Sequence, residues 1–257
     1  MYLFPEALEE IDKHLKEKVV VSLTRVEPPL HPAGPEKIIK DFGMEPEEFK
    51  EQELLDWYNR YEPNPTGYFE ETTEGVFAPW AIMRDDFESV GGHDKLFRPQ
   101  SKEDSDIFNR LYLNGVQFIQ TWKGLVYHMT CRGSRFNPYA GGAPGKDSPE
   151  WIQTTTKNMR NFIRKWGTMV EHDSFMKPIV SPKYNVGFNL TDDCPMDILT
   201  AIEPYCDILF APNQEVIDMY IKEEQELTDY NLNEKLKPES FNPGVEVIFN
   251  PKSMSQY

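Results

Sequence analysis

APWAIMRDDFESVGGHDKLFRPQSKEDSDIFNRLYLNGVQFIQTWKGLVYH, residues 78–128, is the stretch of sequence that decides the fold. An apolar run over 75–83 predicts a strand, and the RDDFESV that follows predicts a short helix that stops at two glycines. The segment 102–115 predicts a second helix, because its apolar residues recur at helical spacing and acidic residues stand at its start. Two short strands are predicted around Lys123 and Gly124. Strands and helices therefore alternate, which is typical of an α/β fold.

The flanking sequence extends this alternation in both directions. Upstream, helices are predicted over 5–17 and 46–59, on either side of a β-branched strand at 19–28. Downstream of Met129, a segment rich in glycine and proline is either a boundary linker or a functional loop. After a helix near 150–166, the chain carries strand and helix signals in a β-α-β-α-β order. We therefore expect a larger α/β domain followed by a smaller one.

The expected domain limits follow from that loop. Residues 1–150 are predicted to hold a mixed sheet with helices, and residues 151–257 a small α/β accessory domain. Beyond residue 160 the motifs indicate no particular chemistry, and a structural or oligomerisation role is the expectation there.

Composition and charge exclude several classes of protein. The 257 residues are 39% hydrophobic and 27% charged, as in a globular protein that buries a core. A formal net charge of −16 repels phosphate backbones, so a nucleic-acid partner is not expected. No apolar window is long enough for a membrane span, and the start of the chain lacks the features of a secretory signal. The odd number of cysteines, without a CxxC pair, indicates a reducing compartment, so we expect a cytoplasmic protein.

Acidic residues cluster where the predicted helix at 102–115 begins. Glu103, Asp104 and Asp106 can stabilise the positive end of that helix, and alone they would indicate no more than this. A carboxylate held at a helix start can also orient or deprotonate a hydroxyl group. The neighbouring pattern favours the catalytic interpretation.

That pattern resembles the acceptor-side, C-terminal part of GT-A-type, family-2-like glycosyltransferases. In this family a strand and a helix lead to a Gly-Gly turn, then to an acidic motif entering a helix, then to a strand that ends in a histidine. The corresponding segments here are Val90-Gly91-Gly92-His93-Asp94, Glu103-Asp104-Ser105-Asp106 and Val126-Tyr127-His128. The resemblance covers residues 1–130, and the order and spacing of its segments are more specific than any one of them.

The resemblance implies roles for three residues. Asp104 is the candidate catalytic base, and Glu103 would orient the acceptor. His128 matches the late histidine that completes the metal site or touches the donor diphosphate in many relatives; by itself, a histidine at a strand end is more often structural. The implied cofactor is a divalent cation, Mn²⁺ rather than Mg²⁺, because Mg²⁺ prefers oxygen ligands alone.

Further residues are candidates for substrate binding. The glycines of the turn can shape a sugar pocket or simply end a helix. A tryptophan can stack on a sugar face or pack in the core, and arginines of the flexible loop can clamp a diphosphate or lie in solvent. The seven candidates are Gly91, Gly92, His93, Asp94, Trp80, Arg132 and Arg135.

The expected function is transfer of a sugar from a nucleotide-sugar donor to a glycan or other hydroxyl acceptor. The fold implied by the resemblance is a truncated GT-A-like mixed sheet, since the resemblance matches Met1 to the point where the donor half, with its Asp-x-Asp motif, ends in relatives. A separate donor-half polypeptide is therefore a possible partner, and weak donor binding by this chain alone is expected. The alternative is a non-catalytic carbohydrate-binding or assembly protein that retains the acceptor-side scaffold.

Overall fold

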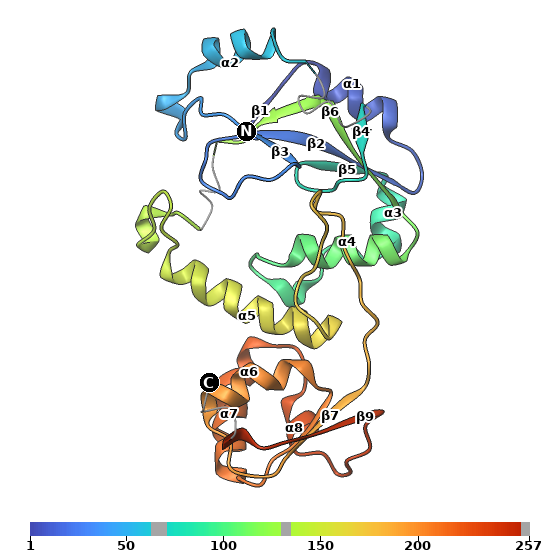
Figure 1. Cartoon of the computed structure of the whole chain (residues 1–257), viewed down its shortest axis with the longest axis vertical. Helices are drawn as coiled ribbons and strands as arrows, with labels where there is room; N and C mark the ends of the chain where they lie inside the picture. Colours follow the sequence, from blue (N-terminus) through green and yellow to red (C-terminus); the bar gives the residue numbers. More distant parts are fainter. Residues whose placement is uncertain (63–70, 130–134, 253–257) are drawn as a thin grey trace. The chain divides into compact units, whose positions relative to one another are not determined.

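A computed structural model describes residues 1–62, 71–129 and 135–252 of the chain (Figure 1). The chain is mixed α/β and divides into two compact units, which confirms the predicted class. Unit 1 comprises residues 1–94, 103–153 and 172–179, and unit 2 comprises residues 95–102, 154–171 and 180–257. The division into domains at 1–150 and 151–257 stays a prediction.

Unit 1 is built on a six-stranded mixed sheet with a main strand order of β1-β6-β2-β3; β4 pairs with β6 and β5 pairs with β2. The strands are β1 (Tyr2–Leu3), β2 (Val19–Glu27), β3 (Lys37–Ile39), β4 (Thr72–Thr73), β5 (Trp80–Ile82) and β6 (Gln117–Tyr127). The helices of this part of the chain are α1 (Glu6–His14), α2 (Glu51–Tyr58), α3 (Arg84–Ser89) and α4 (Glu103–Leu113).

Strand β2 is the centre of this sheet, and all nine of its residues are buried. It runs parallel to both β6 and β3, and antiparallel to the short β5. Parallel strands buried on both faces read as continuous β-branched runs, as 19–28 does. The carboxyl ends of β2 and β6 therefore meet at one edge, where Glu27 and His128 stand.

Two predicted strands proved to be one. The segments on either side of Lys123 and Gly124 form the single strand β6, but its pairing with β2 jumps from Thr121 to Leu125. The residues between form a bulge, and a side chain at Gly124 would lie 2.6 Å from a methyl carbon of Leu23. The prediction was thus wrong about continuity, although it located the interruption.

Helices cover both faces of the sheet. Ala7 and Ile11 of α1 pack on Leu23 and Val126, whereas Ile107 and other residues of α4 pack in the cluster around Val20 and Phe118. Leu23 and Val20 differ in parity along β2, so the two helices lie on opposite faces, as Figure 1 shows. Unit 1 therefore has three layers, helix, sheet and helix.

Unit 2 contains a three-stranded parallel sheet of order β8-β7-β9. Its elements follow in the predicted β-α-β-α-β order, with one added helix: β7 (Val186–Leu190), α6 (Met196–Ile202), β8 (Ile208–Phe210), α7 (Gln214–Glu224), α8 (Leu232–Leu236) and β9 (Val245–Phe249). Helix α5 (Pro149–Trp166) begins in unit 1 and continues in unit 2. Leu190, Leu199 and Leu209 form the centre of one core cluster.

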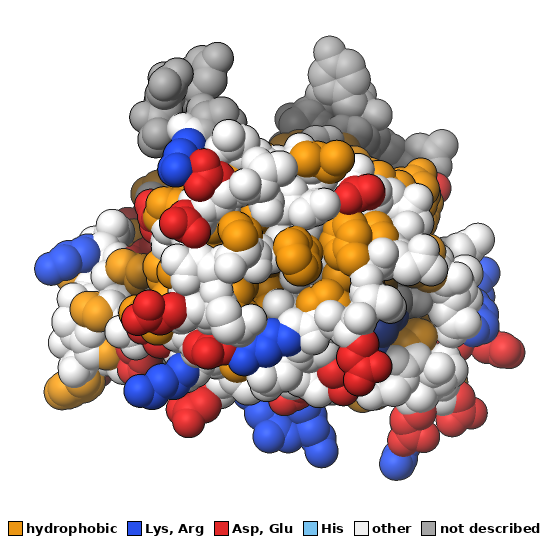
Figure 2. Space-filling view, turned by 90° about the horizontal axis from the view of Figure 1, so that it is seen from below, with side chains coloured by type: hydrophobic (Ala, Val, Ile, Leu, Met, Phe, Trp, Pro, Cys, Tyr) orange, Lys and Arg blue, Asp and Glu red, His pale blue; other side chains and the backbone are white. Residues whose placement is uncertain are grey.

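The surface of unit 2 carries apolar side chains as well as charges. Phe210, Val247 and Ile248 are exposed on β8 and β9. Figure 2 shows hydrophobic side chains gathered on the face seen from below, bordered by acidic and basic ones. None of the helices in the described ranges is both long and apolar enough to cross a membrane. Cys194 and Cys206 are buried free thiols, and Cys131 lies outside the described residues.

Candidate functional site

Helix α4 begins at the predicted acidic cluster, and an ion pair fixes its first turns. Asp106, which is fully buried, accepts hydrogen bonds from Nε and Nη2 of Arg110 at 2.9 and 2.7 Å. The same guanidinium donates to the carbonyl oxygen of Val90, where α3 ends. Asp106 and Arg110 therefore attach the Gly-Gly turn to α4, and their role is positional.

The turn itself requires glycine. Gly91 and Gly92 have φ values of +82° and +64°, a region that side chains disfavour. A Cβ atom at Gly92 would also stand 2.9 Å from the Phe87 ring. The turn leads to His93, an exposed residue whose ring contacts the rings of Phe87 and Trp80.

Asp104 lies half-buried in the first turn of α4, within electrostatic reach of His93 and Arg25. Burial raises the pKa of its carboxyl group, and the charges of His93 and Arg25 offset this rise only in part. A carboxyl group with a raised pKa is a stronger proton acceptor than an exposed one when ionised. The sequence predicted this residue, and the structure adds that His93 lies near it.

A second group of charges lies at the carboxyl end of β2. Glu27 is almost completely buried; its carboxylate lies 2.7 Å from Nζ of Lys37, 3.5 Å from Arg25 and 3.3 Å from Nδ1 of His128. Burial would raise the pKa of Glu27, but the hydrogen bond with His128 and the charges of Arg25 and Lys37 hold it at about 2. Glu27 is therefore a permanent anion among cations. Arg25 connects this group to Asp104, because it acts on both carboxylates.

Arg135 extends the charged region. It donates to Asp147 at 2.6 Å, and its Nη1 lies 3.3 Å from Nδ1 of His31. Burial lowers the pKa of His31, as do the charges of Arg135, Lys37 and Arg25, whereas Glu27 opposes them. Arg135 is thus ion-paired and half-buried rather than solvated.

The structure brings some of the predicted residues together and separates others. Asp104 and His93 lie within electrostatic reach of each other, and His128 joins them indirectly through Glu27 and Arg25. Trp80 packs against Phe87, His93 and Phe108 in a core cluster. Glu103 and Asp94 are half-buried and take part in other interactions. Arg132 lies outside the described residues.

Sequence reasoning missed Arg25, Glu27, His31 and Lys37. The signal was two charged residues at alternate positions near the end of the β-branched run 19–28, which was interpreted only as a buried strand. Charges that alternate at the end of a buried strand point to the same side and need partners. Those partners come from β3 and from the end of β6, which only the fold brings together.

The donors near His128 do not fit a divalent cation. Glu27, the carboxylate next to it, already faces Arg25 and Lys37, whose charges repel a metal ion. Within residues 1–62, 71–129 and 135–252, no three histidine, cysteine or acidic side chains converge to hold a metal. The predicted Mn²⁺ or Mg²⁺ therefore takes no part in the chemistry derived below.

Unit 1 therefore brings together a carboxylate of lowered pKa at Glu27, a carboxyl group of raised pKa at Asp104, and Arg25, whose charge acts on both. Comparison of the chain with protein-family models, with curated proteins and with solved structures found no match. The chemistry of the site must therefore be inferred from its own residues.

Proposed function

We propose that unit 1 is the acceptor side of a nucleotide-sugar-dependent glycosyltransferase with a GT-A-like fold. The observation that carries this proposal is the raised pKa of Asp104, at the start of α4 and beside His93 and Arg25. Transfer to a hydroxyl group requires a base for the hydroxyl proton. A carboxylate that burial makes more basic is suited to this step.

In the proposed reaction, the acceptor hydroxyl donates its proton to the Asp104 carboxylate. The acceptor oxygen forms a bond to the anomeric carbon of the donor sugar, and the bond from that carbon to the nucleoside diphosphate breaks. The neighbouring Glu103 orients the acceptor. The charge of Arg25, and that of His93 when it is protonated, oppose the rise in the pKa of Asp104 and so favour its ionised form.

The arrangement of elements supports the fold part of the proposal. Strand β5, helix α3, the Gly-Gly turn, helix α4 and strand β6 follow in the order that the family resemblance implies. Strand β6 runs parallel to the central β2, with helices on both faces of the sheet. Ligands of open α/β sheets bind beyond the carboxyl ends of parallel strands, where Glu27 and His128 stand.

The experiment is a turnover screen on the full chain with UDP-, GDP-, ADP- and TDP-sugars and a panel of acceptor glycans. It measures release of nucleoside diphosphate and is run with and without Mn²⁺. We expect acceptor-dependent release with at least one donor. The same glycan panel is screened for binding without donor.

The outcomes separate the two functions considered. Glycan binding without turnover of any donor would contradict the transferase and support the non-catalytic carbohydrate-binding protein. If the chain shows no glycan binding and no turnover, both proposed functions are contradicted. Turnover that is unchanged when Asp104 is replaced by Asn would retain the activity but reject the assigned base.

A further inference from the structure

Unit 2 contains a cavity that the proposed transfer reaction does not use. It has a volume of about 370 Å³ and lies beyond the carboxyl ends of β7 and β9, within unit 2 alone. The loop after β7 contributes Cys194 and Pro195, and the residues after β9 contribute Pro251 and Lys252. Pockets of this size hold small ligands, and this place is where parallel sheets commonly bind them.

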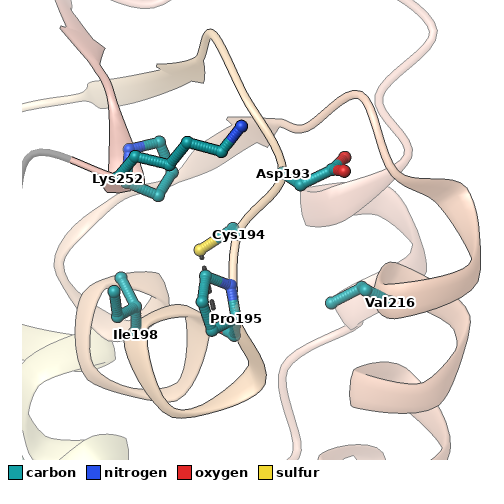
Figure 3. A pocket seen from close by; sticks show the side chains of 7 residues that line it. Asp193, Cys194, Pro195, Ile198, Val216 and Lys252 are labelled. Carbon is teal, nitrogen blue, oxygen red and sulfur yellow. Dashed lines mark hydrogen bonds between the residues drawn. The ribbon is translucent and has the colours of Figure 1, made fainter. Parts of the chain in front are cut away.

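The walls of the cavity are apolar, and its polar groups stand at the rim. Ile198 of α6 and Val216 of α7 form two of the walls, and Cys194, which is 4% exposed, lies next to Pro195 (Figure 3). In Figure 3 the side chains of Asp193 and Lys252 lie on the other side of Cys194 from these walls. A ligand here would bury an apolar body and keep a polar end near Asp193 and Lys252.

The rim carries net negative charge. Asp192 and Asp193 stand next to each other, and Asp197 follows in the first turn of α6. Among the described residues of the cavity lining, the cation is Lys252, whose Nζ lies 2.8 Å from Asp192. Lys252 also lies within electrostatic reach of Asp193, and the charge of Asp197 acts on Cys194, so one cation faces three acids and the net charge is negative.

The pKa of the Cys194 thiol reflects the same apolar and negatively charged surroundings. Burial, and then the negative charge of Asp197, raise its pKa to about 11. The apolar surroundings and the negative potential that disfavour a thiolate also disfavour any anionic ligand. They favour a ligand that brings positive charge to the rim.

We propose that this cavity binds a small organic cation, with an apolar body of about the size of an indole ring and an ammonium group beside Asp193. The apolar body packs against Cys194, Ile198 and Val216. The acidic rim rejects phosphate and carboxylate ligands of the same size. This binding site is independent of the acceptor site in unit 1.

The test uses three indole compounds that share the apolar body and differ in the charge of its end group: tryptamine, the neutral tryptophol and the anionic indole-3-acetate. Their dissociation constants for the full chain are measured by calorimetry at neutral pH. We expect tryptamine to bind about threefold to tenfold more tightly than tryptophol, and indole-3-acetate to bind most weakly. High salt should reduce the differences in affinity among the three compounds.

Variants locate the binding. Asp193→Asn should remove most of the preference for tryptamine. The control is Glu223→Gln, which removes an exposed charge two helical turns after Val216 on α7 and should leave the preference unchanged. Val216→Trp should fill the cavity and weaken all three compounds. If this variant melts at a lower temperature than the parent, the Asp193→Asn comparison still decides the matter.

Three results would overturn the proposal. They are binding of none of the compounds, equal affinity for the cation and the anion, and a preference for tryptamine that survives Asp193→Asn. The turnover screen of unit 1 does not depend on this outcome, since none of the three variants lies in that unit.

Discussion

Glu27 illustrates how one buried residue can hold several elements of a site. Its carboxylate contacts Lys37 of β3, Arg25 of its own strand and His128 after β6. Removing one member of a buried ion group leaves the others charged and without compensation, which costs more than the group itself contributes. The side chain is therefore expected to be structurally critical.

We expect Glu27→Gln to lower the free energy of unfolding by about 3 kcal/mol at neutral pH. The pKa of Glu27 is lowered from 4.5 to about 2 in the folded protein, so its contribution is present above the unfolded pKa. It is lost as the pH falls from about 4.5 towards about 2. Urea unfolding of parent and variant across this range measures the difference, which should shrink as the pH falls.

Glu88→Gln is the matched control. Glu88 pairs with Arg84 at 2.7 Å on the exposed face of α3, so its loss should cost about 0.5 kcal/mol or less. Equal losses in the two variants would contradict the importance assigned to burial at Glu27.

The pKa of Asp104 is shifted upwards, opposite to that of Glu27, so its predicted effect on the free energy of unfolding has the opposite sign. Because burial raises the pKa of Asp104, the folded state binds its proton more tightly than the unfolded state does. Asp104 therefore costs stability once the pH rises above its unfolded pKa, and Asp104→Asn removes that cost. Relative to the parent, the variant should gain stability between acidic and neutral pH. A relative loss in chemical unfolding over this range would show that the pKa of Asp104 is not raised.

At the scale of elements, local sequence patterns predicted helices better than short strands. The helix predicted over 102–115 is α4, and its Ile107, Phe108 and Leu111 are buried, although Tyr112 is exposed at 43%. The segment predicted as a strand over 75–83 forms a strand only at Trp80–Ile82. Pro79, just before it, lacks an amide hydrogen for the sheet, so apolar character alone overstated its length.

Unit 2 is held by ion pairs between elements that no local pattern connects. The guanidinium of Arg164, on α5, donates to Glu203 at 2.6 Å and to Glu224 of α7 at 2.7 Å. Lys235 of α8 lies 2.6 Å from the other oxygen of Glu203. Arg164 and Glu203 are buried, so this network fixes how three helices pack.

Replacing Arg164 with Met should therefore lower the free energy of unfolding of unit 2 by about 3–5 kcal/mol, because Glu203 and Glu224 lose their shared partner. The loss is measured by hydrogen exchange of the backbone amides of α7 and α8 in the full chain. Lys222→Met, an exposed change on α7, should alter exchange little. Similar protection in the two variants would mean that the network contributes no more than a surface charge.

At the scale of the whole molecule, the sequence predicted the α/β class, the order of most elements and the position of Asp104. It could not predict the group around Glu27, since Arg25, Lys37 and His128 are far apart in sequence and meet through parallel strand pairing. The position of Asp104 was predicted because its signal is local, an acid at a helix start, whereas its role as a base stays a prediction. The residues that tune it were missed because their signal depends on the fold.

The replacement of Asp104 by Asn is the most direct test of the transferase proposal. Asn keeps the size and much of the hydrogen bonding of the side chain but cannot accept the hydroxyl proton. General-base catalysis typically contributes at least about a hundredfold to the rate, so we expect a loss of this size or more in acceptor-dependent sugar transfer. Asp85→Asn, which removes an exposed acid from the first turn of α3, is the matched control and should transfer normally.

The measurement is the initial rate of transfer by the parent and both variants, each first shown to melt as a folded protein. The account predicts a rate for Asp104→Asn at least about a hundredfold below the parental rate, with Asp85→Asn unchanged. A folded Asp104→Asn protein that transfers sugar at close to the parental rate would contradict it.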